Sequence, residues 1–86
     1  MLSRYNLQRH AIYKQLLKHR SREWTVASLT ASLGRSATTE SVRATIYVLI
    51  TYGVMIQVPG HHAITARLTA DGENALRSLV ERWSDS

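Results

Sequence analysis

The spacing of apolar residues changes at Gly53, and this change limits the possible folds more than any other feature of the chain. Before Gly53, apolar residues recur at helical spacing within about residues 39–52, namely at Val42, Ile46, Leu49 and Ile50. After it, Val54, Ile56 and Val58 occupy alternate positions, which is typical of a strand. The sequence therefore predicts a helix that runs directly into a β-strand.

The chain then turns back toward this strand. Pro59-Gly60 is a strong turn signal, and residues 62–68 can form the partner strand. Gly60, His61 and His62 are expected at the tip of the resulting hairpin. The sequence therefore predicts a β-hairpin directly after the helix.

Helical spacing also marks the first part of the chain. A helix is predicted from Tyr5 to about Arg20, with its apolar face formed by Leu7, Ala11, Ile12, Leu16 and Leu17. Trp24–Val26 can pair as a short edge strand, and Thr25 can cap a second helix over Val26–Leu33. Gly34 follows at the position of a left-handed C-cap.

Threonines precede the two remaining helices. After a turn at residues 35–37, either Thr38 or Thr39 can cap the helix at 39–52, and Thr69 can cap a last helix. The apolar face of that last helix consists of Leu76, Leu79, Val80 and Trp83. The predicted order is helix, short strand, helix, helix, strand, strand, helix. This order indicates an α+β fold that is mainly α with a small β-hairpin.

The length and residue types exclude several classes of protein. The 86 residues have room for one domain, which we predict to span residues 1–86 with a core of about 7–83 and a frayed tail at 84–86. There is no Cys, and the adjacent His61 and His62 would point to opposite faces of a strand, so we predict no metal and no other cofactor. Because no Gly-rich phosphate loop or clustered acidic residues occur, we expect no enzymatic activity.

The distribution of charge indicates the class of partner. The net charge is +5, but residues 1–67 carry nine Lys or Arg and two acids, whereas residues 68–86 carry two Arg and four acids. A basic body with an acidic end favours a polyanion such as nucleic acid. The longest apolar-rich stretch, 46–56, is too short to cross a membrane, and basic residues interrupt any N-terminal signal segment. We therefore expect a cytoplasmic protein that does not contact a membrane.

Three stretches in this order carry a resemblance to a known family. Residues 26–34 (VASLTASLG) look like a supporting helix, and residues 41–55 (SVRATIYVLITYGVM) look like a recognition helix that enters its first wing strand. Residues 67–76 (RLTADGENAL) look like the Leu-Thr-x-x-Gly-x-x-x-Leu passage with which multiple-antibiotic-resistance-type and phenolic-acid-type repressors leave the wing. Over about residues 7–83 the chain thus resembles a winged helix-turn-helix DNA-binding domain, of the kind found in small bacterial and phage transcriptional regulators.

The resemblance implies sequence-specific binding of duplex DNA by a small transcriptional regulator, or by an accessory factor of excision or another mobile-element process such as that of a phage. The helix at 39–52 would enter the major groove, where Arg43 can contact a guanine, and the wing would touch the backbone. The implied DNA-binding residues are Arg35, Ser36, Thr38, Thr39, Arg43, Ala44, Tyr47, His61, His62 and Arg67. So short a chain has no room for an effector domain, so no small-molecule effector is expected.

Other interpretations of these residues stay open. Arg35 and Arg43 also suit a solvated surface, and Tyr47 also suits packing against the wing. Much of the positive charge lies instead on the first helix and the loop after it, at Lys14, Lys18, Arg20 and Arg22. If these four residues lie on the same side as Arg35 and Arg43, DNA binding is favoured. If basic residues are scattered and the third helix shows a bare apolar patch, a second hypothesis is favoured, in which the chain is a protein-protein interaction module, for example a phage protein that binds a host protein.

Self-association is a further expectation. A domain of this size gains stability from a partner, and related regulators pair through their terminal helices. We therefore expect a homodimer whose interface contains Leu76, Leu79, Val80 and Trp83.

Overall fold

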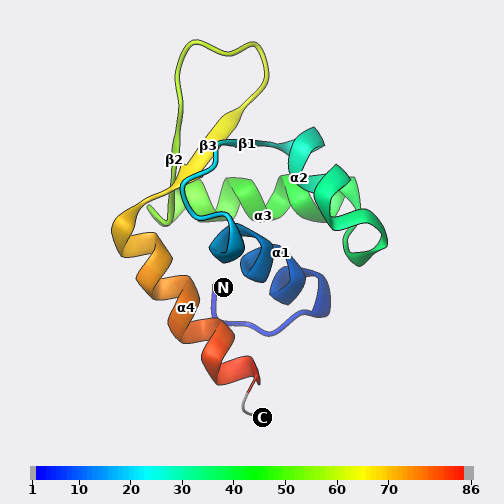
Figure 1. The fold of residues 1–86 in the computed structure, drawn as a ribbon, viewed down its shortest axis with the longest axis vertical. Helices are drawn as coiled ribbons and strands as arrows, with labels where there is room; N and C mark the ends of the chain where they lie inside the picture. Colours follow the sequence, from blue (N-terminus) through cyan, green and yellow to red (C-terminus); the bar gives the residue numbers. More distant parts are fainter. Residues whose placement is uncertain (1, 85–86) are drawn as a thin grey trace.

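The computed structural model describes residues 2–84, which form four α-helices and a three-stranded antiparallel sheet (Figure 1). The elements in chain order are α1 (Leu7–Lys18), β1 (Trp24–Thr25), α2 (Val26–Leu33), the 3-10 turn η1 (Gly34–Ser36), α3 (Thr39–Thr51), β2 (Met55–Gln57), β3 (Thr65–Leu68) and α4 (Ala70–Ser84). The predicted α+β class and element order are confirmed. Of the tail predicted at 84–86, Ser84 is the last residue of α4, and residues 85–86 lie outside the described range.

β3 is the central strand of the sheet, with β1 on one side and β2 on the other. β1 has only two residues, and it places Trp24 opposite Ala66 and Thr25 opposite Thr65. Trp24 and Ala66 are both buried. The predicted short edge strand is thus confirmed, and it joins the start of α2 to the hairpin of β2 and β3.

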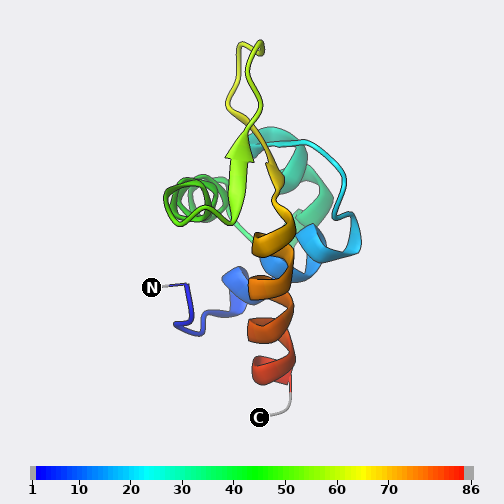
Figure 2. The same cartoon turned by 90° about the vertical axis from the view of Figure 1, so that its left-hand side faces the viewer.

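This hairpin differs from the prediction in two ways. The return strand β3 has only four residues, and the loop over 58–64 extends away from the body of the molecule (Figures 1 and 2). The inward face also differs, because Val54 and Met55 are buried whereas Ile56 is 47% exposed. Val54 precedes the strand, and its amide donates to the Leu49 carbonyl at 2.9 Å. The alternation of the strand therefore starts at Met55 and turns Ile56 outward.

The first helix is shorter than predicted. The side chain of Asn6 caps the free amides of the first turn, so Tyr5 lies outside α1, which ends at Lys18. Leu7 is 74% exposed, contrary to the prediction, because it lies on the same outward stripe of the helix as Lys14. The buried residues of α1 are Ile12, Tyr13 and Leu16.

The second helix has the predicted bounds, because its start is specified locally. The Thr25 hydroxyl accepts from the Ser28 amide at 3.0 Å, and the Ser28 hydroxyl accepts from the Thr25 amide at 2.9 Å, which completes a capping box. Gly34 follows with φ 58° and ψ −121°. This conformation has a positive φ that glycine adopts at little cost, but it is not the predicted left-handed cap. The chain instead continues into η1.

The third helix begins after Thr38, whose hydroxyl accepts from the Ser41 amide at 3.1 Å. Thr38 rather than Thr39 is therefore the cap. The side chains of α3 that are buried are Val42, Thr45, Ile46 and Leu49, and Ile50 is partly buried. The predicted apolar stripe thus faces the core.

The fourth helix packs on α1 and completes the core (Figure 1). Leu76 and Leu79 are buried, and Val80 and Trp83 are partly buried against the same core. The Trp83 ring stacks on Tyr13 with 5.4 Å between ring centroids. The stripe predicted as a dimer interface is therefore largely covered within the chain, and Leu76 and Leu79 present almost no surface to a second copy.

The start of α4 approaches the connection from α3 to β2 very closely. The Thr69 hydroxyl accepts from the Gly72 amide at 2.9 Å and donates to the Gly53 carbonyl at 3.0 Å. A Cβ added at Gly72 would overlap the Val54 carbonyl. The Leu-Thr-x-x-Gly passage thus fixes the base of the hairpin relative to α3.

Candidate nucleic-acid interface

The outward face of α3 presents the side chains that the sequence predicts for it. Thr39, Arg43 and Tyr47 follow one another at intervals of four residues, and Glu40 and Ala44 lie beside them. All five residues are exposed, and Tyr47 is 49% exposed. Because the opposite stripe of α3 is buried in the core, the orientation of this face is fixed by packing.

A groove of about 330 Å³ runs along this face of α3. Thr39, Arg43 and Tyr47 form one wall of the groove. The other walls come from the start of α2 and from the hairpin loop, and consist of Thr25, Val26, Ala27, Ala63 and Ile64. Local spacing does not reveal these five residues, because only the pairing of β1 with β3 brings them together.

The groove combines apolar walls with a few polar groups. Arg43 supplies the charge among its lining residues, and Val26, Ala27 and Ile64 contribute apolar surface. The first turn of α2 borders the groove, and the first amides of a helix carry a positive partial charge. The exposed Arg43 guanidinium can donate hydrogen bonds beside these apolar walls, so the groove suits an anionic or polar ligand group at this position.

The predicted residues that precede α3 are exposed at its N-terminal end. Arg35 and Ser36 belong to η1. The Thr38 hydroxyl is occupied as the cap, and its amide donates to the Gln8 side chain at 2.9 Å. Within residues 2–84, neither Arg35 nor Arg43 forms an ion pair with a carboxylate, so both guanidinium groups face solvent.

The predicted residues of the hairpin lie outside the groove. His61 and His62 are exposed in the loop, and the Nε2 atom of His61 lies 3.9 Å from a carboxylate oxygen of Glu23. Arg67 is exposed on β3, opposite Ile56. The structure therefore groups the α3 residues with the base of the loop but does not add His61, His62 or Arg67 to them.

The basic residues of the first helix do not join this face. Lys14, Lys18, Arg20 and Arg22 are exposed at the C-terminal end of α1 and in the loop after it. In Figure 2 this segment lies on the opposite side of the molecule from α3, which is seen end-on. These four residues therefore do not share a side with Arg35 and Arg43, and the arrangement that would favour DNA binding is not met.

Among residues 2–84, no three His, Asp or Glu side chains lie close enough together to hold a metal ion. In the same part of the chain, every helix falls short of the length and apolar content needed to cross a membrane.

No protein-family model matches the sequence, and no curated protein matches it significantly.

Proposed function

We propose that this chain is a winged-helix protein that binds duplex DNA, with α3 in the major groove and the hairpin along the backbone. The observation that carries the proposal is the exposed stripe of Thr39, Arg43 and Tyr47, which packing holds across a groove from the hairpin loop. The element order and the resemblance of residues 26–34, 41–55 and 67–76 support the same function.

The geometry of α3 suits the major groove of B-DNA, which is about 12 Å wide and admits one helix. Arg43 lies in the middle of the exposed face, where a guanidinium can donate to O6 and N7 of one guanine. Ala44 is beside it and suits contact with a thymine methyl group. The Tyr47 hydroxyl, one turn further along, can donate to a phosphate.

Backbone contacts would orient the helix. Arg35 is exposed before the start of α3, and the first turn of α2 borders the groove. Helix N-termini and arginines are common phosphate ligands. The chain thereby fits a small transcriptional regulator, or an accessory factor of excision or another mobile-element process.

Fluorescence anisotropy with a labelled mixed-sequence duplex tests the proposal across a salt series. We expect the affinity of the wild type to fall steeply with salt. In Arg35→Ala, Arg43→Ala the slope should become less steep by about one unit, since Arg35 would contact a phosphate and each neutralised phosphate contributes about 0.9, and loss of the base contact of Arg43 should weaken binding further. The matched control is Arg4→Ala, Arg82→Ala, which removes the same charge from the two ends of the chain. An equal loss of affinity in both double variants would contradict the proposal, and so would the absence of duplex binding by the wild type at low salt.

A second candidate function has one observation in its favour. The groove is lined by Val26, Ala27, Ala63 and Ile64, and such apolar walls also suit a short peptide segment of a protein partner. In that case Ile64→Asp should abolish recovery of a defined partner in a pull-down, whereas Arg35→Ala should not. Loss of duplex binding in Arg35→Ala and in Arg43→Ala, with no partner recovered by the wild type, favours DNA instead.

A further inference from the structure

A second basic surface lies on the side of the molecule opposite α3. Its members come from α1, from the loop after it and from α4, and we refer to them together as the α1 basic surface. They are Lys14, Lys18, Arg20, Arg22 and Arg77, all of which are exposed. More basic residues thus face this side than belong to the α3 face, where Arg35 and Arg43 are the members.

The two lysines form the outward part of this surface. Lys14 and Lys18 are one turn apart on the exposed stripe of α1, so their side chains are neighbours. Within residues 2–84, neither lysine forms an ion pair with a carboxylate. Both charges are therefore available to a ligand.

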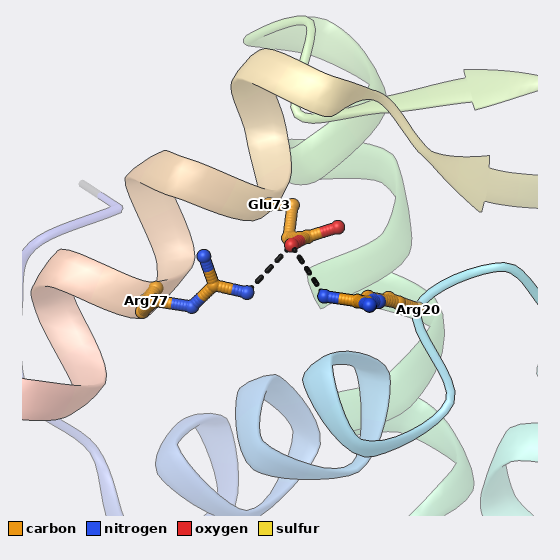
Figure 3. A network of polar contacts seen from close by, with 3 residues as sticks. All are labelled: Arg20, Glu73 and Arg77. Carbon is orange, nitrogen blue, oxygen red and sulfur yellow. Dashed lines mark hydrogen bonds and ion pairs between the residues drawn. The ribbon is translucent and has the colours of Figure 1, made fainter.

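One acid holds two arginines in place, Arg20 in the loop after α1 and Arg77 on α4. Arg20 and Arg77 both donate to the same carboxylate oxygen of Glu73, and the distance from Arg20 is 3.3 Å (Figure 3). The Glu73 side chain is only 21% exposed, whereas Arg20 is 63% and Arg77 is 46% exposed. One recessed negative charge between two outward positive charges leaves a net positive site that is already ordered.

The loop after α1 adds a fifth charge in a fixed orientation. The Arg22 guanidinium lies 4.3 Å from the centroid of a Trp24 ring, and the buried Trp24 belongs to the sheet. Such a cation-π contact holds the arginine against the body of the protein. The acid next to it, Glu23, contacts His61 of the hairpin loop.

The chemistry of this surface favours a phosphate backbone over a protein partner. Protein interfaces are built around buried aromatic or aliphatic anchors. Large apolar side chains exposed among residues 2–84 are Tyr5, Leu7, Tyr47, Tyr52 and Ile56. None of them lies within residues 14–22 or on α4. Leu7 shares the outward stripe of α1 with Lys14 but lies two turns before it, at the edge of the surface. A surface with clustered cations and no apolar anchor among them matches the sequence-independent contacts that proteins make to DNA phosphates.

We propose that the α1 basic surface binds the phosphate backbone of a second duplex segment while α3 holds the first, so that one molecule bridges two segments of DNA. The bridging rests on the proposed function of α3, whereas phosphate binding by the α1 basic surface does not. The C-terminal end of α1 and the loop after it lie on the side of the molecule away from α3, so a second duplex would approach from that side (Figure 2).

A capture assay tests this proposal. A duplex fixed to beads is incubated with protein and with a second, fluorescent duplex, and the fluorescence retained on the beads is measured. The wild type and the control Arg4→Gln, Arg82→Gln should retain the second duplex. Lys14→Gln, Lys18→Gln should retain about tenfold less, because two phosphate contacts are lost, and Arg35→Ala, Arg43→Ala should also lose retention. Thermal unfolding checks that each variant is folded.

The outcomes separate this inference from the proposed function. Unchanged capture by Lys14→Gln, Lys18→Gln would overturn the second site and assign bridging to self-association. In anisotropy with one duplex, a loss of affinity confined to the arginine variant supports α3 as the site of the first duplex, and retention of the second duplex in the capture assay then decides whether the α1 basic surface binds DNA. A loss of duplex affinity confined to the lysine variant assigns phosphate binding to the α1 basic surface and overturns the proposal that α3 binds the duplex. Binding of a polyglutamate peptide that requires the lysines, without any change in capture, would assign the surface to an acidic protein and overturn the proposal.

Discussion

Tyr13 is fully buried where α1 packs on α4, although it carries a hydroxyl group. Its ring stacks on Trp83, and its hydroxyl donates to the Leu2 carbonyl at 3.3 Å. Burial raises the pKa of this hydroxyl above its usual value of 10.0, and the nearby Arg9 guanidinium offsets the effect only in part. The folded protein therefore requires the neutral phenol at this position.

We expect the free energy of unfolding to decrease as the pH rises above about 10, the usual tyrosine pKa. Since the pKa of Tyr13 is raised in the folded state, the folded protein keeps a proton in a pH range where the unfolded chain has lost it, so rising pH favours unfolding. Tyr13→Phe removes this titration. Urea denaturation at about pH 9 and about pH 11 should show a smaller decline for the variant than for the wild type. Equal declines would mean that Tyr13 does not cause the effect.

At the scale of elements, the contact between α4 and the α3–β2 connection positions the hairpin, and Gly72 makes it possible. Gly72→Ala should destabilise the protein by about 1–3 kcal/mol, because the added Cβ overlaps the Val54 carbonyl. This cost exceeds the gain of about 1 kcal/mol that alanine brings to a helix. Ser78→Ala on the exposed face of α4 is the control, and its effect should stay within about 0.5 kcal/mol. A urea midpoint for Gly72→Ala at or above that of the wild type would show that the overlap is relieved without cost.

The helices with strong local signals were predictable to within a residue. Thr25 and Thr38 cap α2 and α3, and the apolar stripe of α3 specifies which face is buried. The strand faces were not predictable in this way, because Ile56 and Met55 are both apolar and only pairing with β3 decides between them. The start of α1 at Leu7 likewise depends on the cap formed by Asn6.

The candidate site was predictable only in part, for a related reason. The exposed residues of α3 follow from its buried stripe, so Thr39, Arg43 and Tyr47 were identified. The remaining walls of the groove, and the position of the α1 basic surface opposite α3, depend on how distant segments pack. The partner of the apolar stripe of α4 was also not predictable, because a stripe does not specify whether α1 or a second copy of the chain covers Leu76 and Leu79.

At the scale of the whole molecule, seven of the eleven Lys and Arg residues form two groups, Arg35 and Arg43 on the α3 face and five residues on the α1 basic surface. The α3 face has few charges and a shaped groove, which suits recognition of base edges. The α1 basic surface has more charges and no apolar anchor, which suits contacts with phosphates. On this account the two faces contribute different parts of DNA binding, the first selecting the site and the second holding another segment.

The most direct test of the central claim is an NMR titration of the ¹⁵N-labelled protein with an unlabelled duplex. We predict that at substoichiometric duplex the largest amide shift changes fall in residues 39–47 of α3 and around the groove at residues 25–27 and 63–64. Unchanged amides in residues 39–47 while the duplex binds elsewhere would contradict the claim that α3 reads DNA.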